Sequence, residues 1–457
     1  MIGLSERLLK RTRGRCPECR EAVAAEVWKI GDGAGNHGRV FLRRMCPEHG
    51  RSETCIASDA RFYWLAQGNR EGGCACDAQT GSCGGTLGRN AEPGDALGVQ
   101  EKLSTCLALI EIVQSCNLAC PTCYADSPTG TSGERLDAVP LVDLQRRIQG
   151  VIDRKGGIEI LQLSGGEPTL HPQFFELLEW LHENPGIDYV LLNTNGIRLA
   201  NDAAFAARLG ETFRYGRFQL YLQFDGVQEA GQRTLRGADF REARIRTIEQ
   251  CGAMGVPLTL AMTVVPENLP FLWEAIEFGL RWRHIRGISF QPVFLSGRVP
   301  RGSFQREHGM ARINTADIIV AAVEQSHGRL RFEDFTPLPC GDPNCATIGY
   351  LLRVNGGTRS ISEFVDFTQV QGFLRDKIRY RLEDLAQCGC ESEPLGRLLK
   401  ELELKEANTF RIFIKPFMDA ETWDDDRIDR CCTHVIRPDG KLDSFCRYYS
   451  GFSDVGS

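Results

Sequence analysis

The sequence has no long hydrophobic run, since nowhere do about 18 apolar residues follow one another as a membrane-spanning helix requires. Its start, MIGLSERLLKRTRGR, also lacks the apolar stretch of a secretory signal peptide. We therefore expect a cytoplasmic protein whose contact with a membrane, if it has one, is peripheral.

An excess of basic residues is also missing. Lys and Arg number 54 against 60 Asp and Glu, which gives a formal net charge of −6. Binding to a nucleic-acid backbone needs a basic surface, so we expect no nucleic-acid partner. Hydrophobic residues make up 42% and charged residues 25% of the 457 residues, as in a folded globular protein with one large core and smaller appendages.

Cysteine, by contrast, is abundant, with 19 residues. In a reducing compartment such thiols serve as metal or cluster ligands more often than as disulfides. Apart from Cys251, which lies in a helix-like segment and is expected to be a buried apolar residue, they fall into groups. The groups are Cys16, Cys19, Cys46 and Cys55; Cys74, Cys76, Cys83 and Cys106; Cys116, Cys120 and Cys123; Cys340 and Cys345; Cys388 and Cys390; and Cys431, Cys432 and Cys446.

The middle of the chain alternates strand-like and helix-like patterns. Strands are predicted at 106–114, 158–166, 188–196, 218–226, 258–266 and 287–294, with helical patterns at 171–184, 202–211, 241–255 and 269–283. Six strands with intervening helices predict parallel βα units with right-handed crossovers. Several of these strands end in small or polar residues, at the rim where α/β barrels carry their chemistry. The predicted fold class is α/β, a partial (β/α)6 barrel of the TIM type.

Four regions are expected along the chain. They are a small rubredoxin-like or zinc-ribbon-like metal module (1–65), a glycine-rich connector that bears cysteines (66–105), the partial barrel (106–299) and a C-terminal region with further cysteine-bearing loops (300–457).

A loop with three cysteines, CNLACPTCY, follows directly on the first barrel strand. Cys116, Cys120 and Cys123 can hold three irons of a [4Fe–4S] cluster and leave the fourth iron open to a ligand that is not protein. A zinc knuckle, or a chance spacing of cysteines, is the alternative.

The second strand ends in SGGEP, where Gly165 and Gly166 allow close approach of the backbone and Glu167 offers a carboxylate to a cation. The next two strand ends read NTNG and QFDG, which are cofactor or substrate contacts or simple turns. With the cysteine loop, these motifs resemble the radical S-adenosylmethionine (SAM) superfamily. The resemblance implies catalytic cluster ligands in Cys116, Cys120 and Cys123, and cofactor contacts from Tyr124, Ser164, Gly165, Gly166, Glu167, Pro168, Asn193, Asn195, Gln223 and Asp225.

Near the N-terminus, CPEC and CPEHG form two knuckles. Two such knuckles fit a tetrahedral site for zinc or rubredoxin-type iron. Cys16, Cys19 and Cys46 are three predicted ligands; His49 is the favoured fourth and Cys55 the alternative.

Two further clusters are predicted from the remaining groups. Cys74, Cys76, Cys83 and Cys106 offer four thiolates for an auxiliary [4Fe–4S] cluster, unless they belong to a linker that is cysteine-rich by chance. Cys340 and Cys345 need two partners, which the C-terminal cysteines can supply.

The segment RPDG indicates a three-residue hairpin loop with Gly440 in the left-handed conformation. This loop pairs Arg437 with Lys441 and sets Cys432 opposite Cys446, whereas a two-residue turn would bring Cys431 to that face. Cys388 or Cys390 could replace one of these ligands.

The order of motifs over nearly the whole chain is similar to the tetraether lipid synthases, formerly described as class D radical methylases of the methanopterin type. The matching stretches include SDARFYW, QPVFLSGR, DFTPLPCGDPNC and CCTHVIRPDGKLDSFCRYY, while the connector CACDAQTGSC departs from the family's tighter cysteine group with a following histidine. The resemblance implies a radical cluster, two auxiliary clusters, a mononuclear iron or zinc site, and coupling of unactivated carbons of lipid chains. The alternatives are methylation of a pterin-like small molecule and, third, a non-catalytic iron–sulfur protein that transfers electrons. The expected electron donor is a ferredoxin or flavodoxin.

Overall fold

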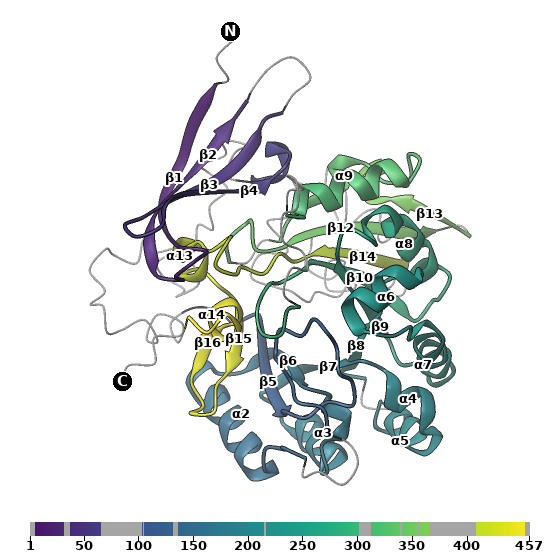
Figure 1. Ribbon diagram of the computed structural model, residues 1–457. Coiled ribbons are helices and arrows are strands. Elements are labelled where there is room, and N and C mark those ends of the chain that lie inside the picture. The colour runs from purple at the N-terminus through teal and green to yellow at the C-terminus, as the bar shows by residue number, and fades with distance from the viewer. Residues whose placement is uncertain are drawn as a thin grey trace.

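The computed structural model describes residues 5–31, 37–64, 103, 105–130, 136–213, 216–300, 312–338, 341–354, 356–364 and 408–452. Within these residues the chain forms two sheets, a four-stranded antiparallel sheet near the N-terminus and a large mixed sheet (Figure 1). No helix in the described part of the chain is long and apolar enough to cross a membrane.

The N-terminal sheet is a simple up-and-down meander. Its strands are β1 (Glu6–Arg15), β2 (Ala22–Ile30), β3 (Arg39–Cys46) and β4 (Gly50–Ala57), paired in that order. The two cysteine knuckles occupy the β1–β2 and β3–β4 turns. Because both turns lie at the same end of the meander, residues 16–19 and 46–49 come together in space.

The six predicted parallel strands are confirmed. They are β5 (Leu107–Val113), β6 (Ile158–Gly165), β7 (Ile187–Thr194), β8 (Phe218–Gln223), β9 (Leu258–Val264) and β10 (Ile285–Pro292), in sequential spatial order. Every residue of β5 is buried, as expected of a parallel strand covered on both faces. The α/β fold class predicted from the sequence is therefore correct.

The C-terminal region extends this sheet at both edges. β14 (Thr409–Ile414) pairs in parallel with β10, and β15 (Thr433–Ile436) pairs in parallel with β5. The described parallel strands thus number eight rather than the six assigned to residues 106–299. The Lys415 ammonium donates to the Thr433 hydroxyl at 2.9 Å. This hydrogen bond joins the residue after β14 to the first residue of β15, so it links the two edge strands of the parallel part of the sheet.

Antiparallel strands flank the parallel ones. β11 (Phe335–Pro337), β12 (Thr347–Val354) and β13 (Gly357–Ser360) lie beyond β14, and β16 (Leu442–Ser444) lies beyond β15. β15 and β16 confirm the predicted hairpin, because Arg437 donates its backbone N–H to Lys441 at 2.9 Å and Gly440 has a φ of +79°. The register places His434 opposite Ser444, two residues from Cys432 and Cys446.

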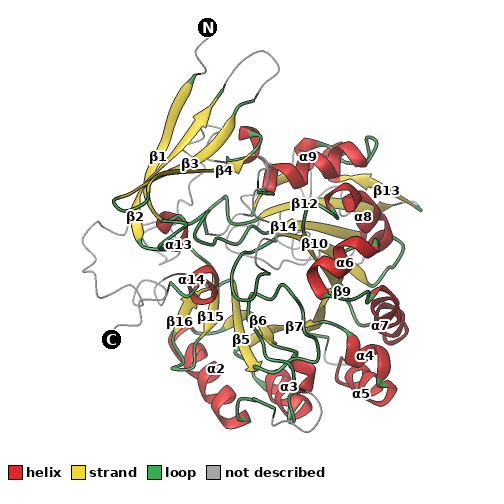
Figure 2. Ribbon diagram, viewed as in Figure 1, coloured by secondary structure: helices red, strands yellow, loops and turns green. Residues whose placement is uncertain are grey.

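Helices cover the outer side of the parallel strands (Figure 2). The α-helices are α2 (Leu141–Lys155), α3 (Phe174–Glu183), α4 (Ile197–Asn201), α5 (Ala203–Phe213), α6 (Glu229–Arg236), α7 (Arg241–Met254), α8 (Leu272–Leu280), α9 (Thr315–Gln325), α13 (Asp425–Ile428) and α14 (Phe445–Ser450). Short 3₁₀ turns occur at Ala60–Phe62, Pro168–Leu170, Leu269–Phe271, Phe332–Asp334 and Ile361–Glu363. Buried side chains of α2, such as Leu144 and Ile148, join the main hydrophobic core behind the sheet.

The joint between β10 and β14 yields a stability prediction. A Cβ at Gly287 would overlap the carbonyl oxygen of Arg411 on β14. We therefore expect Gly287→Ala to lower the free energy of unfolding by about 1–3 kcal/mol and to lower the midpoint of thermal unfolding. Gly150→Ala is the control, because Gly150 lies within α2 and its new Cβ would meet only the flexible end of Arg154. The control should leave the midpoint unchanged or raise it; equal losses in both variants would contradict the prediction.

Candidate active site and metal centre

A cavity of about 270 Å³ opens at the carboxyl ends of the parallel strands. Alternate residues of β5 to β10 and of β14 point into it, together with the loop that follows β5. Among the described residues its lining holds arginine and lysine but no carboxylate. The cavity therefore favours a ligand that carries an anionic group.

The three predicted cluster cysteines meet at this cavity. Cys116, Cys120 and Cys123 all line it, and Cys116 and Cys120 are buried. The loop is held by its backbone: Cys123 and Arg298 exchange N–H···O bonds of 2.8 and 2.9 Å, and the Arg298 guanidinium donates to the Cys120 carbonyl at 3.0 Å. A short bridge to a distant segment thus holds the backbone of the cysteine loop.

Burial raises the pKa of the Cys116 thiol to about 12, and it also raises the pKa of Cys120. A buried thiolate is costly unless a positive group compensates it. These two buried thiols, with the less buried thiol of Cys123 at the edge of the same cavity, fit the ligand set of a [4Fe–4S] cluster with one open iron, because binding to iron compensates the thiolate charge.

The glycine-rich stretch packs against the start of the cysteine loop. Gly166 donates its N–H to the Val113 carbonyl at 2.8 Å, and Glu167 donates to the Ser115 carbonyl at 3.1 Å. Gly165 has a φ of +124°, and a Cβ at Gly166 would overlap the Ser115 carbonyl oxygen. Only glycine permits this approach, and both glycines line the cavity.

Glu167 is not part of the cavity lining, although it bonds to two residues that are, Thr194 and Asn195. Its carboxylate accepts bonds from the Thr169 hydroxyl at 2.7 Å, the Thr194 hydroxyl at 2.8 Å and the Asn195 backbone N–H at 2.8 Å. Burial raises the pKa of the Glu167 carboxyl, although these hydrogen bonds act to lower it. In this geometry Glu167 connects the ends of β6 and β7. The sequence predicts that its carboxylate contacts a cation, and this stays a prediction. Pro168 is likewise buried, in the turn that Glu167 caps.

The end of β7 supplies two asparagines that line the cavity. Asn193 donates to the Ser164 hydroxyl at 3.3 Å, so Ser164 supports the lining from behind. Asn195 donates to the Asn117 side chain at 2.6 Å and lies 3.9 Å from the Cys116 sulfur. Asn195 therefore connects the cysteine loop with the glycine-rich stretch.

Arg236, at the end of α6, is a cavity residue that the sequence did not single out. It forms a bidentate pair with buried Asp225 at 2.7 and 2.9 Å, and its charge opposes the effect of burial on the pKa of Cys120. Asp225 is thus a partner for Arg236 and for Arg244, 3.4 Å away, and does not line the cavity itself. Gln223 does line it, beside Arg236. No sequence signal marks Arg236, because α6 is otherwise a polar helix typical of a surface.

Tyr124 lines the cavity from an aromatic cluster. Its ring lies 4.8 Å from Tyr449, edge to face, and 5.5 Å from Phe445. The Tyr449 hydroxyl donates to Glu111, at the end of β5, at 2.8 Å. C-terminal helix α14 therefore covers one side of the cysteine loop, and burial raises the pKa of Tyr124 well above its ordinary value.

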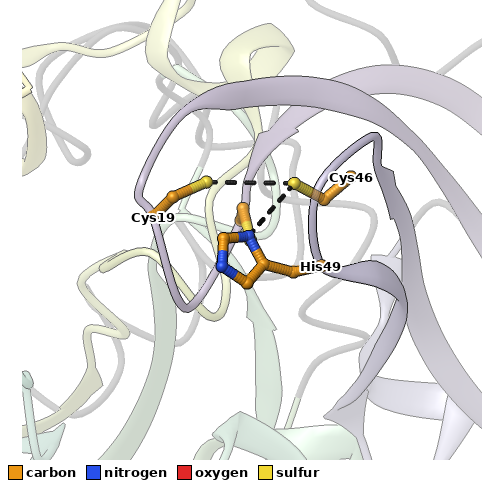
Figure 3. A group of neighbouring side chains, drawn as sticks. Cys19, Cys46 and His49 are labelled. Atoms are coloured by element: carbon orange, nitrogen blue, oxygen red, sulfur yellow. Dashed lines mark hydrogen bonds between the residues drawn. The ribbon is translucent and has the colours of Figure 1, made fainter.

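The N-terminal knuckles form a compact group of four potential ligands. The ligand atoms of Cys16, Cys19, Cys46 and His49 all lie within 4.8 Å of one another. Figure 3 shows Cys19, Cys46 and His49 pointing toward one another, with a Cys19–Cys46 sulfur distance of 3.8 Å and a Cys46 sulfur to His49 Nδ1 distance of 3.5 Å. Tetrahedral zinc with bonds of about 2.3 Å to sulfur gives ligand separations of about 3.8 Å, so the donor set fits zinc. The His49 backbone N–H, followed by its side chain, lowers the pKa of Cys46 to about 6.

The alternative fourth ligand, Cys55, is not part of this group. It lies on β4, opposite Phe41, and lines a small separate cavity of about 40 Å³. The structure thus favours His49.

A second group of thiols gathers near the C-terminus. Burial, and then the nearby thiols of Cys432, Cys446 and Cys345, raise the pKa of Cys431 well above its ordinary value. The Cys431 thiol donates to the Thr433 carbonyl at 3.1 Å, whereas a Cβ on Gly341 would meet the Cys432 sulfur at 3.4 Å. Cys345, Cys432 and Cys446, three of the four predicted ligands, therefore lie near one another, and the choice between Cys432 and Cys431 as a ligand stays a prediction.

Other predicted ligands lie outside the described residues. They are Cys74, Cys76 and Cys83 of the connector, Cys340, and the two unassigned cysteines Cys388 and Cys390. Of the connector set only Cys106 is described, and its backbone N–H donates to the Cys432 carbonyl at 3.0 Å. Cys106 therefore lies beside the C-terminal group. Cys251 is fully buried, as expected.

Comparison with known families supports the assignment of the barrel and of the N-terminal module. Residues 110–279 match the model of the radical SAM superfamily, and residues 8–58 match the HMPTM N-terminal zinc ribbon domain. The chain is 26% identical to the 7,8-dihydro-6-hydroxymethylpterin dimethyltransferase of Methanocaldococcus jannaschii, over 96% of this chain and 93% of that protein. It is 29% identical to the GTP 3′,8-cyclase of Synechococcus elongatus, over 42% of this chain and 59% of that one.

Solved structures with partial similarity include two SAM-bound proteins. The chain resembles anSMEcpe with bound AdoMet at 19% identity and a TM-score of 0.36, covering 48% of this chain and 57% of that one. It resembles Streptococcus suis SuiB bound to S-adenosylmethionine at 16% identity and a TM-score of 0.35, covering 45% and 44%. The fold assignment rests on the family model and on the geometry above.

The metal centre gives a first prediction. His49→Ala should lose most of the zinc, because three thiolates alone do not close a tetrahedral site, whereas His49→Cys should retain it. Zinc per chain is measured by inductively coupled plasma mass spectrometry on protein purified without added metal, separately from the iron of any cluster. Cys55→Ala is the matched control and should keep its metal; loss in Cys55→Ala with retention in His49→Ala would contradict the assignment.

Arg236 gives a second prediction. Because it is a cation in the cavity wall, Arg236→Met should weaken binding of SAM, whose methionine part carries a carboxylate, by about 10-fold or more. Arg233→Met, at an exposed position of the same helix, is the control and should bind normally. Anaerobic equilibrium dialysis measures both affinities. Unaltered affinity in Arg236→Met, with its iron content intact, would rule out this role.

Proposed function

We propose that this chain, a radical SAM enzyme with an N-terminal zinc ribbon, forms a carbon–carbon bond at an unactivated carbon of a small polar ring. Methyl transfer to a pterin-like heterocycle is the reaction we favour. A [4Fe–4S] cluster on Cys116, Cys120 and Cys123 would supply the electron that cleaves bound SAM to methionine and a 5′-deoxyadenosyl radical, which removes hydrogen from carbon.

The observation that carries the substrate class is the polar inner face of the barrel. Polar side chains from four of the parallel strands, β6, β8, β9 and β10, line the cavity below the cysteine loop: Gln162, Gln219, Tyr221, Thr259, Ser289 and Gln291. They are joined in part by hydrogen bonds, since Gln219 donates to Thr259 at 2.6 Å and Gln291 donates to Tyr221 at 2.8 Å. Such donors and acceptors match the ring nitrogens and carbonyls of a heterocycle, whereas a hydrocarbon chain would offer no partner for the hydrogen-bonding capacity that these internal bonds leave unused.

The relative from Methanocaldococcus jannaschii supports the same proposal. It matches this chain over nearly its whole length, and its name describes methylation of a pterin. In the proposed reaction the backbone at Gly165 and Gly166, with Asn193, Asn195 and Arg236, orients SAM. The aromatic group around Tyr124 keeps water from the reacting carbon.

Auxiliary clusters are part of the proposal. We assign one [4Fe–4S] cluster to Cys345, Cys432 and Cys446 together with Cys340, and a second to the connector with Cys106. The cavity also reaches Ala346 and Thr433, each adjacent to a cysteine of the C-terminal group. A cluster at that position would accept or return an electron at the substrate, with a ferredoxin or flavodoxin as the external donor.

Coupling of lipid chains is the second candidate, and one observation favours it. Apolar residues cover the other side of the same cavity: Leu107, Leu109, Ile160, Leu191 and Phe413. A hydrocarbon chain could lie along this side. Both candidates form a carbon–carbon bond after hydrogen removal, and they differ in whether the new carbon comes from a methyl group or from a second chain.

The two candidates separate in one experiment. Cells with and without the gene are compared by mass spectrometry of pterins and of lipids, and reconstituted enzyme is assayed for 5′-deoxyadenosine. We expect one or more added methylene masses in a pterin-like compound, whereas loss of two hydrogens per joined pair of lipid chains would establish coupling instead.

A variant pair tests the polar lining in the same assay. Tyr221→Phe removes a hydroxyl that faces the cavity and should lower the yield of methylated product about 10-fold or more while 5′-deoxyadenosine still forms. Tyr448→Phe, at a half-buried tyrosine outside the cavity lining, is the control and should keep its yield. Equal yields in wild type and Tyr221→Phe would contradict the proposed substrate class.

A further inference from the structure

A buried arginine contacts the C-terminal thiol group. Arg427, in α13, has a side chain only 7% exposed, and its Nη2 lies 3.6 Å from the sulfur of Cys345. The same nitrogen donates to the Asn344 carbonyl at 2.9 Å, which fixes the guanidinium beside that thiol. The segment DDRIDR resembles an exposed charged turn in the sequence, so nothing there marks the residue.

The positive charge of Arg427 is only partly compensated. Its nearest carboxylate is Asp342, at 3.9 Å from Nε, and Asp342 makes a closer pair of 2.6 Å with Arg430. The Arg430 side chain is 43% exposed, so water screens its charge, whereas Arg427 acts from the interior. Lys415 adds a second cation near the group, and its ammonium donates to the Thr433 hydroxyl at 2.9 Å rather than to a described carboxylate.

We propose that Arg427 sets the reduction potential of the iron–sulfur cluster held by the Cys345, Cys432 and Cys446 group. This inference rests on the auxiliary cluster of the proposed function. Adding one electron makes such a cluster more negative by one charge, and a fixed cation that donates an N–H to a ligand sulfur stabilises that reduced form. Arg427 therefore raises the potential and makes this cluster the acceptor for an electron released at the substrate.

A purely structural role is the competing explanation, because Arg427 also holds the 341–345 loop through Asn344 and Asp342. That role predicts changes in cluster content and stability, but no change in the potential of a cluster that still forms. The reduction potential therefore distinguishes the two roles.

The experiment uses the full chain, reconstituted anaerobically, with Cys116, Cys120 and Cys123 all changed to Ala so that the radical cluster does not contribute. Dithionite supplies the electrons, and EPR follows the reduction. The signal of interest is the one that disappears when Cys446→Ala is added. Arg427→Met should lower the equilibrium constant for its reduction about 10-fold, which is 59 mV for one electron. Arg427→Lys keeps the charge, and Arg430→Met removes the other Asp342 partner without touching Cys345, so both should stay near the starting value.

The possible outcomes test the role of Arg427 and the auxiliary-cluster assignment separately. An unchanged potential in Arg427→Met, with its signal present, overturns the inference and leaves the proposed function intact. A shift of equal size in Arg430→Met overturns it as well, because the effect would then come from the shared aspartate. If no signal disappears with Cys446→Ala, the group holds no cluster and the auxiliary-cluster assignment fails too. If Arg427→Met does not retain the cluster, Arg427→Gln, which keeps an amide donor without charge, replaces it with the same expected direction.

Discussion

The site depends on the close approach of two backbone segments, the end of β6 and the start of the cysteine loop after β5. Gly166 and Glu167 donate their N–H groups to the carbonyls of Val113 and Ser115, and no side chain fits between the segments. This contact sets the distance between the three cysteine thiols and the glycine backbone that lines the cavity. A cluster and a cofactor that must react with each other need that spacing to be fixed before either one binds.

At two places in the structure, a buried arginine lies between a carboxylate and a cysteine thiol. Beside the cysteine loop, Arg236 pairs with fully buried Asp225 and faces Cys120. At the C-terminal group, Arg427 lies between Cys345 and Asp342. In each case a carboxylate keeps an arginine in the interior, and the arginine in turn faces a thiol that would carry negative charge as a ligand. The protein therefore provides part of the electrostatic environment of both groups before iron enters.

The features that could be predicted from the sequence are those with local causes. Apolar runs predicted β5 to β10, the RPDG turn predicted the register that brings Cys432 toward Cys446, and cysteine spacing predicted the compact group of Cys16, Cys19, Cys46 and His49. The placement of β14 and β15 on opposite edges of one sheet could not be predicted, because it depends on pairings between segments more than 100 residues apart. Arg236 and Arg427 could not be predicted for a related reason. Each lies in a helix with a polar sequence and becomes buried only because distant segments pack against it. The orientation of Glu167, with its carboxylate bonded to Thr169 and Thr194, likewise follows from the approach of β7.

The central claim is that Cys116, Cys120 and Cys123 hold a cluster with one iron left for SAM. EPR of the reduced, anaerobically reconstituted protein, recorded with and without SAM, tests it most directly. We expect SAM to shift the g values of one cluster signal and leave any other cluster signal unchanged. Identical spectra with and without SAM, in protein that carries its full complement of iron, would contradict the claim.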